Sequence, residues 1–310
     1  MALFRIENNE HLETIKEQPF KLEKEIQSLT ENNLKGIFGL EFVRSEFSLN
    51  NFRIDSLAYD RDAKSFVIIE YKRDKNFSVI DQGYAYLSLM LNNKADFILE
   101  FNENTSETLK RNDVDWSQSR VIFISPSFTT YQKEAINFKD LPIELWEIKR
   151  YNNRTVNYNQ IKTSGAQESV KTISRQDKTI EKVTKEIKVY TENDHINNGN
   201  TETQELYEKL KDGILNLDDN ITFQAKKQTI GFKIEDNIFL DVVILAKSLK
   251  MYLNLKSGEL QDEKQLARDV SNVGHWGNGS YEIKMHDTEN IEYILSLIKQ
   301  SLRLNKNNVG

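Results

Sequence analysis

The sequence predicts an α/β fold, a mixed β-sheet flanked by helices, followed by a separate small α+β domain. In the first half, helical and strand-like apolar patterns follow one another in the order α-β-β-β-α-β-β-α-β. A polar stretch then interrupts this pattern, and a new series of helix and strands follows it. The chain has 310 residues, which is long for a single core and sufficient for two domains.

The first half is expected to begin with a helix over residues 21–33, because Leu22, Ile26 and Leu29 share one helical face. A second helix is expected after Ser78, which has the spacing of a capping box with Asp81. Alternating or continuous apolar runs predict strands at residues 42–47, 52–59, 66–72, 95–101, 120–125 and 143–149. Further helices are expected over residues 78–91 and 130–137.

Residues 163–203 are poor in large apolar side chains and are expected to form a linker between a domain of residues 1–162 and one of residues 204–310. A short helix from Ile180 to Val189 remains open within it. The second domain is expected to start and end with helices, at residues 205–215 and 290–302. Strands are expected between them at residues 221–223, 228–234, 239–245 and 249–255.

Composition limits the function classes. The chain has no cysteine, which excludes disulfides, zinc–thiolate sites and a cysteine nucleophile. No signal peptide or membrane-spanning run is visible, so we expect a cytoplasmic protein. The net charge of −6 argues against binding nucleic acid through bulk electrostatics. Such binding requires a metal ion or a local patch, for which Lys72, Arg73 and Lys75 are the candidate cluster.

Charged residues at the end of one predicted strand need an explanation. Glu70 and Lys72 share a face with Phe66 and Ile68, because side chains alternate along a strand. On the preceding strand, Asp55 interrupts an apolar pattern and can lie across from Glu70. Two converging carboxylates form a hard oxygen site that suits Mg²⁺, with Mn²⁺ as a substitute. A lysine beside the metal can orient water or steady developing charge during phosphodiester hydrolysis.

With Asp55 on one strand and Glu70-Tyr71-Lys72 closing the next, the sequence resembles the PD-(D/E)XK (restriction-endonuclease-like) nuclease superfamily over about residues 20–150. Gln82 and the tyrosines after it resemble the helix of its NucS-related branch. The resemblance implies metal ligation by Asp55 and Glu70, catalysis by Lys72, an auxiliary role for Gln82, and a metal-binding acid on the first helix, Glu25. The proline of the family pattern is absent, since Ile54 precedes Asp55.

Several simpler interpretations stay open. Glu70 and Lys72 can form an ordinary ion pair at a strand end, and Glu46 competes with Glu25 as the third acid because its strand neighbours that of Asp55. Tyr86, one turn after Gln82, is expected in the core. Arg53 and Arg73 can contact phosphate or pair with neighbouring acids.

The second domain contains an unusual loop, Gly-His-Trp-Gly-Asn-Gly, at residues 274–279. We favour a turn whose Trp276 fills a core over a functional loop, because His275 has no visible ligand or nucleophile partner. Residues 266–270 and 274–277 resemble an uncharacterised C-terminal domain, sometimes labelled a predicted transport protein, that accompanies PD-(D/E)XK-like domains. Its ligand or partner stays open.

The leading hypothesis is therefore a Mg²⁺-dependent endonuclease that hydrolyses nucleic acid, DNA above all, in defence or repair. The alternative is a module of the same fold that binds nucleic acid or a protein partner without turnover, which the acidic net charge favours. A third hypothesis is a small-molecule sensor that works through the loop around His275. Whether the chain is a monomer or a homodimer, and whether its substrate is DNA or RNA, is not determined by these patterns.

Overall fold

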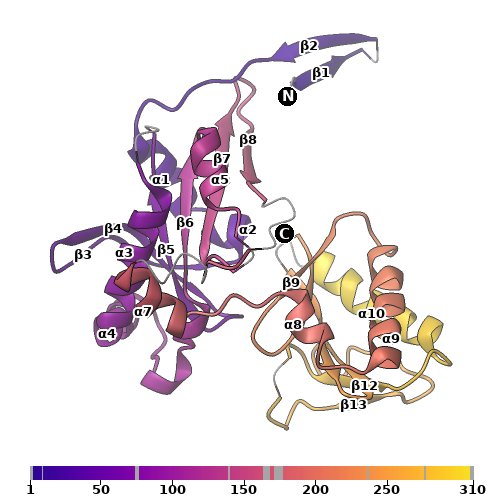
Figure 1. Ribbon diagram of the computed structural model, residues 1–310. Helices are drawn as coiled ribbons and strands as arrows, with labels where there is room; N and C mark the ends of the chain where they lie inside the picture. Colours follow the sequence, from indigo (N-terminus) through magenta and orange to yellow (C-terminus); the bar gives the residue numbers. More distant parts are fainter. Residues whose placement is uncertain are drawn as a thin grey trace. The chain divides into compact units, whose positions relative to one another are not determined.

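A computed structural model describes residues 3–8, 10–73, 77–138, 140–162, 168–170, 177–235, 237–275 and 277–307. Lys75, Trp276 and the first residues of the expected linker, 163–167, lie outside them. Contacts divide the chain into two compact units, residues 1–189 and 190–310 (Figure 1). None of the helices in the described part of the chain is long and apolar enough to cross a membrane.

The N-terminal unit is a mixed α/β structure. Its strands are β1 (Leu3–Glu7), β2 (His11–Ile15), β3 (Glu41–Leu49), β4 (Phe52–Asp60), β5 (Ser65–Tyr71), β6 (Arg120–Ser125), β7 (Ile143–Arg150) and β8 (Val156–Gln160). Its helices are α1 (Glu23–Glu31), α2 (Leu34–Phe38), α3 (Val79–Asn92), α4 (Lys94–Asn104), α5 (Thr130–Ala135) and α7 (Lys178–Glu186), with short 3₁₀ turns at Arg111–Asp113 and Trp116–Gln118. The mixed sheet flanked by helices that the sequence predicts is therefore confirmed.

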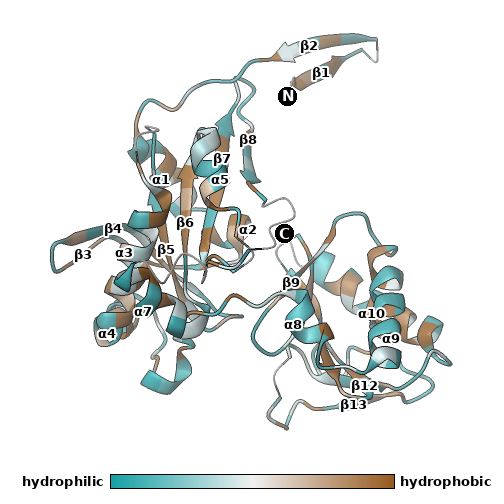
Figure 2. Ribbon diagram, in the orientation of Figure 1, coloured by the Kyte–Doolittle hydropathy of each residue, from teal (hydrophilic) through white to brown (hydrophobic). Residues whose placement is uncertain are grey.

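Six strands form the main sheet in the order β3-β4-β5-β6-β7-β8. The pairs β5–β6 and β6–β7 are parallel and the others are antiparallel. Every residue of β5 and all but the first of β6 are buried, and Figure 2 shows hydrophobic colours in this part of the sheet. Continuous apolar strands of this kind are typical of a sheet that is covered on both faces.

Two separate cores cover these faces. On one face, the apolar side chains of α3, α4 and α7 pack against residues that include Phe66 and Ile68 of β5. On the other, α1 and α2 pack against residues that include Val67 and Ile69. Helix α3 comes very close to the sheet, because a Cβ on Gly83 would lie 2.4 Å from the side chain of Ile143. The glycine thus lets the polar residues at the start of α3 approach the end of β5.

A hairpin that the sequence patterns did not predict precedes this fold. Strands β1 and β2 pair only with each other, and Phe4, Ile6 and Leu12 are exposed on it (Figure 1). Its apolar residues do not join either core, so the pattern rule that infers a strand from a buried face does not detect it.

Two further expectations differ from the structure. Residues 95–101, expected as a strand, lie in helix α4, where Phe97 and Phe101 are buried one turn apart. A short apolar run fits both periodicities, and here packing selects the helical one. The expected linker of residues 163–203 contains α7, whose Ile180 and Val183 are buried in the first core.

The C-terminal unit is α+β. It contains α8 (Glu192–Ile196), α9 (Thr201–Leu215) and α10 (Ile291–Asn307), and strands β9 (Ile221–Ala225), β10 (Ile230–Ile234), β11 (Asn237–Leu245), β12 (Ser248–Leu253), β13 (Ala267–Asp269) and β14 (Tyr281–Met285). The strands form one antiparallel sheet in the order β13-β14-β12-β11-β10-β9. Apolar residues of α9 and α10 share a single core with one face of this sheet.

The described part of the glycine-rich loop, residues 274–275 and 277–279, packs directly on the other face. A Cβ on Gly277 would lie 2.3 Å from the ring of Tyr252, and one on Gly279, whose φ is +88°, would lie 1.9 Å from the Leu253 carbonyl oxygen. Between them, Asn278 donates from its backbone N (2.8 Å) and side-chain Nδ2 (3.0 Å) to Asp241, which is 1% exposed. The two glycines are therefore required by close approach, as the turn interpretation expects.

Candidate functional site

Glu70 lies at the carboxyl end of β5 on the face that α3 covers. Its side chain is buried, at 3% exposure for the residue. Oxygen Oε1 accepts hydrogen bonds from Lys72 Nζ at 2.7 Å and from Gln82 Nε2 at 3.1 Å. Oxygen Oε2 is also buried but has no hydrogen-bond partner within the described residues. An ionised carboxylate oxygen without a partner is costly in a protein interior, so this atom marks a site that a ligand can complete.

Helix α3 supplies the residues that contact Glu70 from the side facing the sheet. Ser78 caps it by accepting a hydrogen bond from Asp81 N (3.2 Å), as the capping-box spacing predicts. Gln82 then lies in the first turn beside Glu70, and Gly83 provides the close approach described above. Tyr86, one turn further, is 4% exposed, accepts from Gln82 Nε2 and donates to the Arg53 carbonyl, both at 3.3 Å. Tyr86 is thus a core residue that also borders the site.

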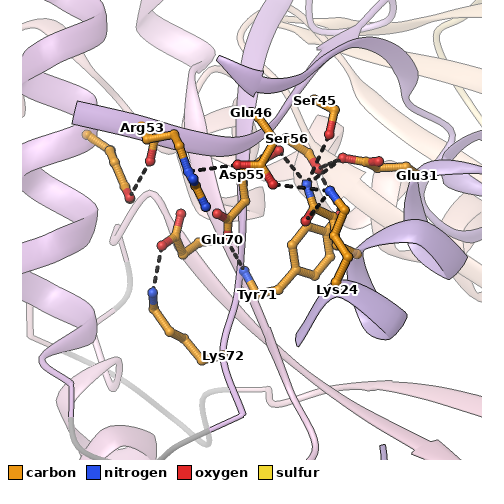
Figure 3. Close-up of polar contacts among 12 residues, drawn as sticks. Lys24, Glu31, Ser45, Glu46, Arg53, Asp55, Ser56, Glu70, Tyr71 and Lys72 are labelled. Atoms are coloured by element: carbon orange, nitrogen blue, oxygen red, sulfur yellow. Dashed lines mark hydrogen bonds and ion pairs between the residues drawn. The ribbon is translucent and has the colours of Figure 1, made fainter. Parts of the chain in front are cut away.

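Asp55 faces Glu70 from the neighbouring strand. The ladder between β4 and β5 ends at Ser56 and Ile69, and continuing its register by one residue sets Asp55 opposite Glu70. Instead of a backbone pair, Asp55 Oδ2 accepts a hydrogen bond from the N–H of Tyr71 at 3.0 Å. Figure 3 shows the carboxylates of Asp55 and Glu70 turned toward each other. Burial, followed by the nearby charge of Glu70, raises the pKa of Asp55 to about 6.

The structure does not bring Glu25 into this group. Its Oε2 pairs with Arg150 Nη1 on β7 at 3.1 Å. The α1 residue that faces Asp55 is Gln27, which is 4% exposed and donates from Nε2 to the Asp55 carbonyl at 2.9 Å. Gln27 Nε2 also reaches Glu31 Oε1 at 2.9 Å. Of the predicted stripe, Ile26 is buried, but Leu22 is 60% exposed and precedes α1. Periodicity also did not show which polar residue of this helix faces the site.

Glu46 is the third carboxylate beside Asp55 (Figure 3). The ladder of β3 and β4 pairs Ser45 with Ser56, which places Glu46 next to Asp55, and Glu46 has a left-handed backbone with φ of +56°. It pairs with Arg53 at 2.7 Å and with Lys24 at 3.2 Å. Burial favours a higher pKa for Glu46, but hydrogen bonds from Lys24 and Gln27 and the charge of Arg53 outweigh it and lower the pKa.

These residues can be tested for their fit to a metal ion. Within the described residues, no group of three or more His, Asp or Glu side chains is already arranged as a metal cage. Mg²⁺ does not need one, since it commonly takes one or two carboxylates and keeps several waters. Asp55 and Glu70 offer two facing carboxylates, and Glu70 Oε2 has no hydrogen-bond partner within the described residues, with the Tyr86 hydroxyl close to the same carboxylate. The donor set therefore fits a magnesium-like ion, and Glu46 is occupied by its two cations.

The two arginines expected to contact phosphate, Arg53 and Arg73, both contact other groups of the protein. Arg53 is paired with Glu46, and its side chain is 67% exposed. Arg73 donates from Nη1 to the Lys21 carbonyl at 2.6 Å, and its backbone N donates to Glu23 at 2.7 Å. These contacts hold the segment after β5 against the start of α1, next to the candidate site.

Comparison with known proteins gives one full-length relative, which is described as an uncharacterized protein from Haemophilus influenzae (strain ATCC 51907 / DSM 11121 / KW20 / Rd). It is 53% identical over 292 residues, which cover 94% of this chain and 96% of the relative. The chain belongs to the family of this protein. Residues 192–305 also match the family described as Domain of unknown function (DUF5655), so the boundary of that family lies close to the start of the C-terminal unit.

Some solved structures show a weak similarity to part of this chain. The EndoMS–dsDNA2 complex is 17% identical with a TM-score of 0.27, covering 47% of this chain and 65% of that one. The repair endonuclease from Pyrococcus abyssi is 17% identical with a TM-score of 0.25, covering 47% and 64%. The chain thus spans slightly less than two thirds of the solved structures that it matches. Similarity at these scores does not indicate the function of this chain.

Proposed function

We propose that the N-terminal unit is a Mg²⁺- or Mn²⁺-dependent endonuclease that hydrolyses phosphodiester bonds of nucleic acid, with DNA as the expected substrate. The observation that carries the proposal is Glu70 Oε2, a buried carboxylate oxygen without a protein partner, facing the desolvated carboxylate of Asp55. Asp55 and Glu70 would hold the ion, which supplies a Lewis acid for the phosphoryl oxygens.

The other residues of the site position these ligands. Lys72 and Gln82 both bind Glu70 Oε1, so they fix the carboxylate and direct Oε2 toward Asp55. The Lys72 side chain is 22% exposed, so its ammonium can also reach a substrate and stabilise negative charge that develops during attack. The N–H of Tyr71 holds Asp55 in the same way that Gln82 holds Glu70. Assignment to the NucS-related branch, and a role in repair or defence, are part of the proposal.

The test is cleavage of linear, nicked, single-stranded and modified DNA and RNA with Mg²⁺ or Mn²⁺. Wild type is compared with Glu70→Gln and Lys72→Ala, each expected to lower the cleavage rate at least ~100-fold. A matched control combines Glu181→Gln and Lys185→Ala, which removes an exposed ion pair on α7 of the same unit. Metal-dependent cleavage that persists in Glu70→Gln at the control's rate would refute the proposed site.

The second candidate is a module with this fold that binds nucleic acid or a partner without turnover. It is favoured by the net charge of −6. The two candidates differ at the metal. A binding module tolerates Asp55→Asn with unchanged affinity for its target in EDTA and in Mg²⁺, and no substrate of the panel is cleaved.

A further inference from the structure

The open face of the C-terminal sheet is the largest feature that the proposed site does not use. Helices α9 and α10 share the core on one face, where Met251 and Ile283 are buried. The residues that alternate with these point to the opposite face. There the glycine-rich loop and Val270 cover Tyr252 and Val243, and no helix of the described residues packs on the rest. On β12, β14 and β13 that face carries a charged group, named here the β12–β13 patch: Lys250, Lys284, Arg268 and Glu282.

The charges in the β12–β13 patch are unbalanced. Glu282 is the carboxylate of the group, and it is reached by Lys250 Nζ at 3.4 Å, Arg268 Nη2 at 3.6 Å and the Tyr252 hydroxyl at 3.1 Å. Lys284 is exposed and forms no ion pair within the described part of the chain. The patch thus holds three cations and one carboxylate, of which Lys250 and Arg268 pair with Glu282 and Lys284 does not. The side chain of Arg268 is 65% exposed against 14% for Glu282.

The strand register also opposes like charges. Lys250 and Lys284 are direct partners in the antiparallel ladder of β12 and β14. Two cations in facing positions have Cβ atoms about 4.5–5.5 Å apart and destabilise a sheet. An arrangement that costs stability without improving packing is expected where an anion binds between the side chains.

The glycine-rich loop hides negative charge on the same face. Asp241 lies beside Tyr252 in the ladder, but Asn278 and Thr229 bind its oxygens, and it is 1% exposed. The ring of His275 stacks on Tyr252 with centroids 4.9 Å apart at 13°. Exposed acids instead lie on α9, on the other side of the sheet, at Glu202, Glu205 and Glu208. The helix side also carries exposed cations, Lys209 on α9 and Lys299 on α10. What distinguishes the opposite face is that its acid Asp241 is buried and bound by Asn278.

We propose that the β12–β13 patch binds the phosphate backbone of nucleic acid. Adjacent strands are about 4.8 Å apart, so the three cations extend over roughly 10 Å across β12, β14 and β13, which is enough for more than one phosphate. The choice of nucleic acid over another polyanion rests on the proposed nuclease function of the first unit. The patch gives an acidic chain a local binding surface for the class of substrate that the N-terminal unit is proposed to cleave.

The test measures binding of a short labelled DNA duplex to the full-length protein in EDTA, where cleavage cannot interfere. The variant Lys250→Ala/Lys284→Ala is compared with Lys209→Ala/Lys299→Ala, which removes two exposed lysines from α9 and α10. Each phosphate contact contributes about 0.9 to the slope of log affinity against log salt, so the patch variant should lose about two units of slope. Its affinity at low salt should fall at least ~10-fold, and the control should match wild type.

Further readouts keep the proposal falsifiable. Lys284→Ala alone is expected to leave the melting temperature equal or higher, which separates a binding defect from misfolding. An unchanged salt slope in a folded patch variant, or polyglutamate competing as well as DNA, would overturn nucleic-acid binding here. Glu70→Gln should bind DNA like wild type in EDTA. If wild type cleaves no substrate but the patch variant still loses salt slope, only the proposed enzyme is refuted. If wild type cleaves nucleic acid but the patch variant keeps the wild-type salt slope, only this inference is refuted.

Discussion

The two sheets of this protein place charge in opposite ways. In the N-terminal unit helices cover both faces, and at the strand ends Glu70 is buried and Asp55 is partly buried. In the C-terminal unit helices cover one face, and Lys250, Lys284 and Arg268 stand on the other in contact with solvent. Enclosed carboxylates suit metal chemistry, because desolvation strengthens their interaction with an ion. Exposed cations suit binding, because they meet a large anion without a cavity.

The comparison predicts that a buried polar group stabilises only the unit in which it lies. The largest effect is expected for Asp241→Ala, because it leaves Thr229 and Asn278 without their buried acceptor. The loss should be about 2–4 kcal/mol and confined to the C-terminal unit. Hydrogen exchange followed by mass spectrometry checks this, with Asp241→Asn as the milder control. If Asp241→Ala lowered protection from hydrogen exchange equally in both units, the two units would not be stabilised independently.

The close approach of α3 gives the next effect. A side chain at position 83 meets Ile143, so Gly83→Val should cost about 1–3 kcal/mol and shift Gln82 away from Glu70. Gly36→Ala in α2 is the matched control, because no atom lies within 4 Å of its added Cβ. Thermal unfolding and cleavage are measured together. A Gly83→Val protein with wild-type stability would show that α3 is not held this closely.

Asp55→Asn is expected to act in the opposite direction on stability. Burial raises the folded pKa of Asp55 to about 6 from 3.8, so the free energy of unfolding decreases as pH rises between these values. At pH 8 without metal, removing this charge should stabilise the protein by ~1–2 kcal/mol. Chemical denaturation in EDTA checks this, with Glu181→Gln as control. A metal-free Asp55→Asn protein less stable than wild type would contradict an electrostatic cost at the site.

The smallest effect concerns an exposed pair of the C-terminal unit. The hydrogen bond from Lys306 on α10, at 2.6 Å, is the largest cause that lowers the pKa of Asp218 to about 2, followed by the backbone hydrogen bond from Asn220. A lowered pKa adds stability above the unfolded value of 3.8 that is lost as pH falls toward 2. Asp218→Asn should therefore be slightly less stable than Asp219→Asn at pH 7, and the difference should shrink through pH 2 and disappear well below it. A difference that keeps its pH 7 size at and below pH 2 would exclude this ion pair as its cause.

From the sequence, the position of Glu70 on its strand could be predicted, but the residue of α1 that faces the site could not. Strand alternation predicted that Glu70 shares a face with Phe66 and Ile68, and the core on that face contains both. Helical periodicity was less informative, because it did not distinguish Glu25, which pairs with Arg150, from Gln27, which contacts Asp55. The side of a helix that meets a sheet depends on the packing of the whole layer, and the sequence of that helix alone does not determine it.

Other differences have local reasons. The segment of residues 95–101 is helical because Phe97 and Phe101 fit the first core one turn apart. Strands β13 and β14 lie outside the predicted elements. For β13 the reason is that it has three residues, none of which is buried. The need for Gly277 and Gly279 becomes visible only when the ring of Tyr252 and the backbone of Leu253 are in place.

Binding of Mn²⁺, followed by electron paramagnetic resonance, tests the central claim most directly, because it reports on the metal centre whatever the substrate is. Wild type should bind an ion that both Asp55→Asn and Glu70→Gln lose, while Lys72→Ala and the Glu181→Gln/Lys185→Ala control keep it. Mn²⁺ binding that is unchanged in Asp55→Asn and Glu70→Gln, or absent from wild type in the presence of DNA, would contradict a metal centre between β4 and β5.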